Sequence, residues 1–138
     1  NIDYATINRV LFDIKSPSRL NAEKEAMSNI SYYLDGKCTV VCITQDMIKR
    51  LNLSLDDFEG ITAISTQVEG VCVGITMKEM EKDTFKVSLR SVSDVDVSKV
   101  CAKFGGGGHV KAGGCKLENI SCNDAIKQLV DAVSEELS

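Results

Sequence analysis

The first third of the chain has apolar residues at helical spacing. Over residues 3–15 an apolar residue recurs every three or four positions, at Ile7, Val10, Leu11 and Ile14. This spacing places them on one face of a helix that needs a partner. A second helix is predicted to follow, with Ser16 as its N-cap and Pro17 in its first turn. Its apolar stripe continues through Leu20, Met27, Ile30 and Leu34 until Gly36 ends it.

Runs rich in β-branched residues predict strands in the middle of the chain. Residues 37–44 (KCTVVCIT) indicate a buried strand, followed by a helix over residues 45–51, and the acidic segment 54–61 indicates a short surface helix. Residues 70–79 and 83–91 are typical of a hairpin joined by a polar turn. In its second strand Arg90 alternates with the apolar residues, so Arg90 is expected on the opposite face.

The last third predicts a short helix, a strand and a long helix. Val97, Val100, Cys101 and Phe104 form an apolar face after Asp96, and Gly105 is expected to end that helix in a left-handed conformation. A strand over residues 114–119 precedes a final helix whose start, Ser121 with Asp124, resembles a capping box. The fold class is therefore α/β: a small mixed β-sheet flanked by helices and preceded by linker helices. Residues 1–36 are expected to be the helical linker, and residues 37–138 the folded domain.

Length and composition predict one compact domain with a helical lead-in. The chain has 138 residues, 43% of them hydrophobic and 26% charged, and a single proline. It has no signal-peptide pattern and no apolar run of roughly 20 residues, so we expect a cytoplasmic protein with no membrane partner. It begins at Asn1 rather than Met, with a helical pattern already running at Ile7, and we expect it to be a piece of a longer polypeptide. The oligomeric state is left open, a homodimer included.

Charge and cysteine content exclude several classes of function. A net charge of −4 argues against a non-specific duplex binder, so any anion must be bound locally. Six cysteines lie in apolar segments without a Cys-x-x-Cys pair, and there is one histidine, so buried reduced thiols are favoured over disulfides, a zinc site or a redox protein. The acidic residues Asp56, Asp57 and Glu59 match no common coordination pattern and are expected on a solvated face.

Four consecutive glycines, Gly105, Gly106, Gly107 and Gly108, precede the chain's only histidine, His109. Glycine loses more backbone freedom on folding than any other residue, so such a run needs a reason. A backbone without Cβ atoms lets N–H groups converge on a phosphate, and the following residues could supply a helix with His109 and Lys111 at its start. A flexible connector with an exposed histidine is the alternative, but such linkers usually mix in serine. The segment is not a Walker loop, because no Gly-Lys-Ser/Thr ends it.

Arg90 is the second candidate, because a guanidinium fork suits a phosphate. A solvated residue in a surface ion pair is the alternative, and for Arg90 taken alone it is the favoured one.

Three segments together resemble a known family. They are SLRS at residues 88–91, DVSKVCAKFGGGGHVKAGGC at 96–115 and EGVCVGI at 69–75. They resemble the C-terminal domain of the DHH phosphoesterases, above all the short bacterial enzymes that degrade nanoRNAs and dephosphorylate 3′-phosphoadenosine 5′-phosphate, which are relatives of the RecJ exonucleases. Residues 11–20 and 35–44 also look like that family's connecting helices and first C-terminal strand. In relatives the residues after the histidine often continue toward Ala-Ala-Gly, whereas here they read Lys-Ala-Gly-Gly.

The resemblance implies a two-domain hydrolase that is an exoribonuclease or a phosphatase. Its N-terminal DHH domain, absent from this chain, would bind Mn²⁺ and activate water. This chain alone would then hold no metal, contain no catalytic residue and be inactive. It would bind a short single-stranded RNA or DNA or a small phosphorylated nucleotide. The residues that the resemblance assigns to the substrate are Arg90, Gly106, Gly107, Gly108 and His109, with Gly105, Ser91 and Lys111 beside them.

Other functions remain open at this point. A related domain is attached to alanyl-tRNA synthetases, so an RNA-binding appendage is one alternative. A phosphodiesterase for cyclic or linear dinucleotides is another. All of these ligands present a phosphate beside a base, and the sequence does not separate them.

Overall fold

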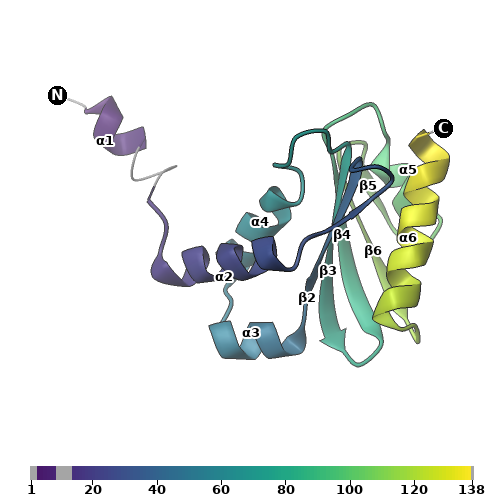
Figure 1. Cartoon of the computed structure of the whole chain (residues 1–138), viewed down its shortest axis with the longest axis horizontal. Helices are drawn as coiled ribbons and strands as arrows, with labels where there is room; N and C mark the ends of the chain where they lie inside the picture. The colour runs from purple at the N-terminus through teal and green to yellow at the C-terminus, as the bar shows by residue number, and fades with distance from the viewer. Residues whose placement is uncertain (1–2, 9–13, 138) are drawn as a thin grey trace.

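The computed structural model describes residues 3–8 and 14–137. The described residues form six helices and six strands. The strands make a single sheet with helices on both faces (Figure 1). In chain order the elements are α1 (Tyr4–Asn8), α2 (Pro17–Ser28), β1 (Ser31–Tyr33), β2 (Cys38–Ile43), α3 (Gln45–Leu51), α4 (Leu55–Ile64), β3 (Val73–Glu81), β4 (Thr84–Ser91), α5 (Val97–Ala102), β5 (Gly107–His109), β6 (Ala112–Glu118) and α6 (Cys122–Leu137). Within the described ranges no helix is long and apolar enough to cross a bilayer.

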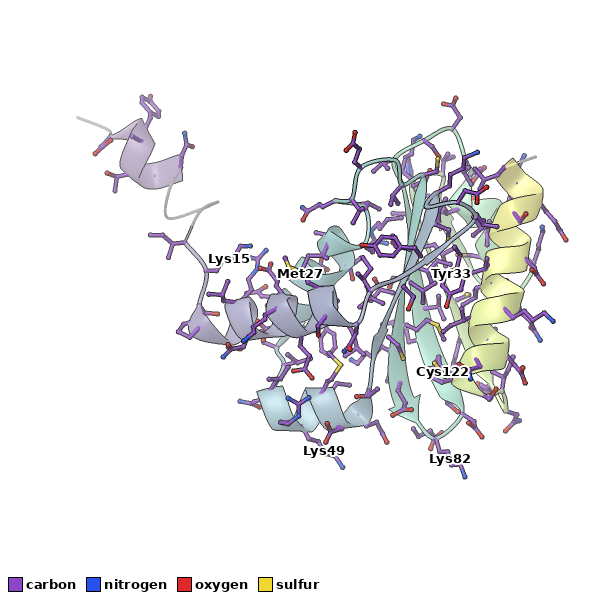
Figure 2. The ribbon with its side chains drawn as sticks, viewed as in Figure 1. Lys15, Met27, Tyr33, Lys49, Lys82 and Cys122 are labelled. Carbon is purple, nitrogen blue, oxygen red and sulfur yellow. The ribbon has the colours of Figure 1, made fainter. Side chains whose placement is uncertain are left out.

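The sheet has the strand order β1-β2-β3-β4-β6-β5, with β2 and β3 parallel and every other pair antiparallel. The parallel pair needs a crossover, and α3 and α4 supply it. The β3–β4 hairpin turns at Lys82, at the lower end of the sheet in Figure 2. The predicted fold class, a small mixed sheet flanked by helices, is confirmed.

One face of the sheet carries the larger core. Phe85, Val87 and Leu89 are fully buried there, as their alternation predicts, and α5 and α6 cover them. Figure 1 shows α6 lying along this side while α2, α3 and α4 lie on the other. A smaller cluster on that second side is built from Ala22, Ala26, Val41, Ile43, Met47 and Ile61. The second side is covered mainly over β2, which leaves the same face of β4 and β6 open.

The two N-terminal helices differ from their prediction. The helix expected over residues 3–15 is α1, which ends at Asn8; Ile14 and Lys15 are not helical, and residues 9–13 lie outside the described part. The second helix starts as predicted, with the Ser16 side chain accepting from the Arg19 N–H, but it ends at Ser28 instead of running to Leu34. Residues 31–33 form β1 against β2, and Leu34 has a φ of 56° in the following turn.

The predicted apolar stripe of the second helix faces solvent. Leu20 and Met27 are 58% and 57% exposed, whereas Ala22 and Ala26 are fully buried. Small side chains let α2 approach α4 closely, since a Cβ placed on Gly60 of α4 would lie 2.9 Å from Glu23 Oε1. The close packing of these small residues therefore decides which face of α2 is buried, and Leu20 and Met27 of the predicted stripe remain exposed. The other helices and strands predicted from hydrophobic patterning, including the helix over residues 45–51, are present, whereas the segment after the glycine run is a strand.

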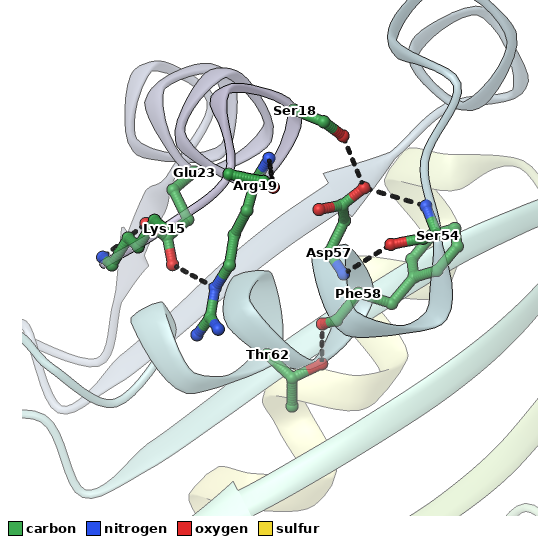
Figure 3. Close-up of polar contacts among 9 residues, drawn as sticks. Lys15, Ser18, Arg19, Glu23, Ser54, Asp57, Phe58 and Thr62 are labelled. Carbon is green, nitrogen blue, oxygen red and sulfur yellow. Dashed lines mark hydrogen bonds and ion pairs between the residues drawn. The ribbon is translucent and has the colours of Figure 1, made fainter. Parts of the chain in front are cut away.

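A polar network joins α2 to α4 (Figure 3). Asp57 is only 2% exposed, so the prediction that it belongs to a solvated acidic face is wrong. Its carboxylate accepts from the Ser54 N–H at 2.8 Å and from the Ser18 hydroxyl at 3.0 Å, and the Ser54 side chain accepts from the Asp57 N–H, which makes a capping box. Burial raises the pKa of Asp57, but these hydrogen bonds and Arg19 more than offset that effect, so the pKa lies below its usual value.

We expect Asp57→Ala to lower the free energy of unfolding by about 1–2 kcal/mol, because it removes the cap of α4 and its bond to α2. Asp56→Ala is the control, because Asp56 is exposed in the same first turn. The Asp57 pKa is depressed on folding, so its contribution is present above about pH 4 and is lost as the pH falls through the folded-state pKa. The free energies of unfolding of the wild type and of Asp57→Asn, measured with urea, should therefore become equal in acid. Equal effects at the two positions would contradict this role.

Candidate functional site

The glycine run ends in an edge strand rather than a loop before a helix. Gly107–His109 forms β5, which pairs antiparallel with the start of β6, and Val110 and Lys111 make the two-residue turn. The helix expected after the glycines is absent, so His109 and Lys111 do not lie at a helix N-terminus. The reason is the second glycine pair, because Gly113 and Gly114 lie opposite Gly108 and Gly107 and let two backbones pair without side chains between them.

Three of the four glycines are required by the fold. Gly105 ends the helical turns after α5 with a φ of 80°, as predicted. A Cβ on Gly106 would lie 2.2 Å from Gly114 O, and a Cβ on Gly108, whose φ is 138°, would lie 2.7 Å from Ala112 O. Gly107 differs, because a Cβ there would meet nothing within 4 Å. Space above Gly107 is thus open, and the fold gives no reason for glycine at that position.

Strand register places Arg90 and His109 on one face of the sheet. Arg90 in β4 pairs with Ala112 in β6, which pairs with His109 in β5, and directly paired residues project to the same side. Two strand spacings of about 4.8 Å separate their backbones. Arg90 Nη1 donates to Leu89 O at 3.2 Å, and no described carboxylate pairs with it, so the surface ion pair considered from the sequence is not formed.

His109 and Lys111 have local hydrogen bonds. The His109 ring is exposed, and its Nδ1 accepts from the Lys111 N–H at 3.1 Å, while no described residue bonds to Nε2. The Lys111 ammonium donates to Ser93 O. The remaining predicted residue, Ser91, lies on the buried side of β4, where its hydroxyl accepts from the Ser93 N–H at 3.3 Å. Ser91 is therefore not on the face that carries Arg90 and His109.

Three rows of residues cross the open face. One row contains Arg90, Ala112 and His109, and a parallel row contains Lys78, Lys86 and Lys116, each directly opposite the next. Between them runs a row of small side chains, Thr76, Ser88, Gly114 and Gly107. We call this middle row the small-residue trough. Like charges directly opposite one another destabilise a sheet. Lys116 is paired with Glu118 at 3.1 Å and Lys78 lies over the Phe58 ring, whereas no described carboxylate forms an ion pair with Lys86.

Two adjoining hollows lie along the trough. One of about 250 Å³ lies between α4 and the strands β3 and β4, and one of about 520 Å³ lies over β4 and β6. Lys86 and Ser88 line both. Sequence reasoning missed the lysines; the alternation of Lys86 with Phe85 and Val87 was visible, but the alignment of three lysines depends on register. An acidic chain thus carries a locally basic, concave face.

All six cysteines are free thiols, buried or half-buried, as expected. Burial raises the pKa of Cys38 to about 12, and burial followed by the neighbouring Cys122 thiol raises that of Cys42 to about 12. Cys101 lies beneath the hairpin, 2.9 Å from the position of a Cβ on Gly113. In the described part of the chain no three His, Cys, Asp or Glu side chains cluster in a way that could hold a metal ion.

Comparison with known proteins relates this site to one family. The chain is 29% identical over 124 residues to the bifunctional oligoribonuclease and PAP phosphatase NrnA of Thermus thermophilus, covering 90% of this chain and 36% of that protein. It is 28% identical over 68 residues to the cyclic-di-AMP phosphodiesterase GdpP of Geobacillus thermodenitrificans, covering 49% of this chain and 10% of that protein. Our chain thus spans about a third or less of the length of these relatives.

A solved structure has the same fold over nearly the whole chain. The crystal structure of an exopolyphosphatase-related protein from Bacteroides fragilis superposes with a TM-score of 0.81 at 27% identity, covering 97% of this chain and 39% of that one. Residues 63–138, more than half of the chain and all of the strands that form the trough, match the DHHA1 domain family. The chain therefore belongs to the DHHA1 domain family, the C-terminal domain of DHH phosphoesterases that its glycine and arginine motifs resemble.

Proposed function

We propose that this chain is the nucleotide-binding part of a phosphoesterase, and that its open face holds a phosphate and the terminal nucleotide of the substrate. The small-residue trough between the lysine row and the row that contains Arg90 and His109 is the observation that carries this proposal. A phosphate can approach the backbone at Gly107, where nothing stands above the chain, with Arg90 and His109 on one side of it. The guanidinium offers a bidentate fork, and an edge strand such as β5 has one unpaired side of its backbone.

The substrate class proposed is a short oligonucleotide or a small phosphorylated nucleotide. The names of the related oligoribonuclease, PAP phosphatase and cyclic-di-AMP phosphodiesterase support it, since each acts on a phosphate ester of a nucleotide. Hydrolysis itself we assign to a DHH domain outside this chain, with Mn²⁺ as its metal. The part that we propose for this chain is to bind and orient the substrate.

We expect Arg90→Ala and His109→Ala each to weaken the binding of a 5′-phosphorylated dinucleotide about ten- to a hundredfold, as loss of a charge-assisted hydrogen bond costs roughly 1.5–3 kcal/mol. The affinity of Arg90→Lys should lie between those of the wild type and Arg90→Ala, because a lysine keeps the positive charge but not the bidentate geometry of the guanidinium group. Isothermal titration calorimetry measures this. Lys82→Ala is the control, since Lys82 lies at the far end of the β3–β4 hairpin (Figure 2).

The same titrations distinguish the competing functions. Dinucleotide binding that is insensitive to both substitutions would contradict the proposal. Tight binding of intact tRNA together with no binding of the dinucleotide would favour an RNA-binding appendage instead. Mn²⁺-dependent hydrolysis by this chain alone would contradict the assignment of catalysis to another domain.

Gly107→Ala should change binding without changing stability. Its Cβ would meet no atom within 4 Å of the folded protein but would stand above the trough, so we expect the free energy of unfolding to stay within about 0.5 kcal/mol and affinity for the phosphorylated dinucleotide to fall. Gly108→Ala is the matched contrast, because its Cβ would collide with the backbone of Ala112 and should cost about 1–3 kcal/mol of stability. Chemical unfolding and titration of both variants test this, and unchanged affinity in Gly107→Ala would contradict it.

A further inference from the structure

The smaller hollow beside the trough has a buried hydroxyl with no partner. Thr76 lies in β3, directly opposite Ser88, and lines the cavity of about 250 Å³ beneath α4. The residue is 4% exposed, and its Oγ1 is the buried side-chain polar atom that lacks a hydrogen bond among the residues described. Leaving a buried hydroxyl unpaired costs about 1–3 kcal/mol, and a valine of the same shape would avoid that cost. A ligand in the cavity would supply the missing partner.

The α4 side of the cavity is aromatic and apolar. Phe58 and Leu55 of α4 line it, and Ile43 of β2 adds apolar surface from the sheet beside β3. Lys78 Nζ lies 4.1 Å from the centroid of the Phe58 ring, so a base that stacks on this face of the ring would displace the ammonium group. A flat heteroaromatic group suits such a wall, because it can stack on a ring or on apolar surface while its edge accepts or donates hydrogen bonds. Glu59 lines the cavity together with Lys78, Lys86 and Arg90, so charge alone does not distinguish a phosphate from a base there. The aromatic and apolar side chains and the unpaired Thr76 hydroxyl are the features that suit a base.

Size and position connect this cavity to the trough. Its volume lies below the roughly 300–1,000 Å³ of pockets that enclose a whole drug-sized ligand, so it suits one part of a nucleotide. Arg90 lines the cavity and also belongs to the row that contains His109. A phosphate held at Arg90 would thus place the attached nucleoside next to the opening beneath α4.

We propose that this cavity is a nucleobase pocket, in which Phe58 provides the stacking surface and the Thr76 hydroxyl hydrogen-bonds the base of the nucleotide whose phosphate Arg90 holds. The pocket rests on the proposed function, because that function supplies the phosphate anchor. It adds a specificity element, since the base, and not only the phosphate, then contributes to affinity.

The test compares adenosine 5′-monophosphate with ribose 5-phosphate, which has the same phosphate and sugar but no base. By calorimetry with the whole chain we expect the adenosine nucleotide to bind at least about tenfold more tightly, because base stacking contributes roughly 1–3 kcal/mol. Thr76→Val and Phe58→Leu should each lower the affinity for the adenosine nucleotide more than the affinity for ribose 5-phosphate, and so reduce that preference. Thr76→Val should also unfold at the same or a higher temperature, so lost binding would not reflect a lost fold.

Thr66→Val is the matched control, as it makes the same chemical change at the C-terminal end of α4, where the hydroxyl bonds to Ala63 O. Equal affinity of the wild type for the two probes, with both weakened by Arg90→Ala, would overturn the base pocket and leave the proposed function intact. A base preference that survives both Thr76→Val and Phe58→Leu would also overturn the pocket. If neither probe binds the wild type, the proposed function itself fails.

Discussion

The close contact between the glycine hairpin and β6 is the constraint on which the candidate site depends. Gly106 and Gly108 approach the backbone of β6 so closely that a methyl group at either position would collide with it. This contact, with a two-residue turn at Val110 and Lys111, fixes the register of β5 on β6. Because β6 is in turn paired with β4, the same register brings His109 into line with Arg90. A shift of one residue would send His109 to the opposite face of the sheet.

Helices cover only one face of the sheet over β4 and β6, so the residues that this register aligns on the other face remain accessible. The apolar residues of β4 and β6 are buried under α5 and α6, and the alternate residues must then project to the other side. Over β2 that side is covered by α2 and α4, but over β4 and β6 it stays open, and the cations gather there. This explains how a chain with a net charge of −4 presents a basic face. Most of its acidic residues lie in helices and turns, and the exceptions in the strands are Glu79, Glu81 and Glu118, of which Glu118 pairs with Lys116 at 3.1 Å.

Sequence reasoning succeeded where local chemistry decides the structure. The alternation along β4, the caps at Ser16 and Ser121, and the left-handed Gly105 were all predictable from neighbouring residues. It failed where a distant partner decides. The stripe that includes Met27 predicted a buried face, but the tight fit of Ala22 and Ala26 against α4 turned Met27 to solvent.

The candidate site shows the same limit. The glycines were singled out as a candidate site, yet they were assigned to a loop before a helix because their pairing with Gly113 and Gly114 is not a local property. The lysine row and the unpaired hydroxyl of Thr76 were missed for the same reason. The alignment of the lysines and the position of Thr76 in the cavity both depend on the register of neighbouring strands.

The capping network of α4 and the proposed base pocket are parts of one unit. Asp57 and Phe58 are adjacent in the first turns of α4, so the carboxylate that is buried against Ser18 and Ser54 sets the position of the ring that lines the cavity. Glu23, held by Lys15 at 2.6 Å and Arg19 at 3.3 Å, packs against the same helix at Gly60. The buried carboxylates between α2 and α4 therefore do more than stabilise a helix pair. They fix the wall of the cavity relative to the sheet, and a rigid wall of this kind is what a pocket needs to discriminate between bases.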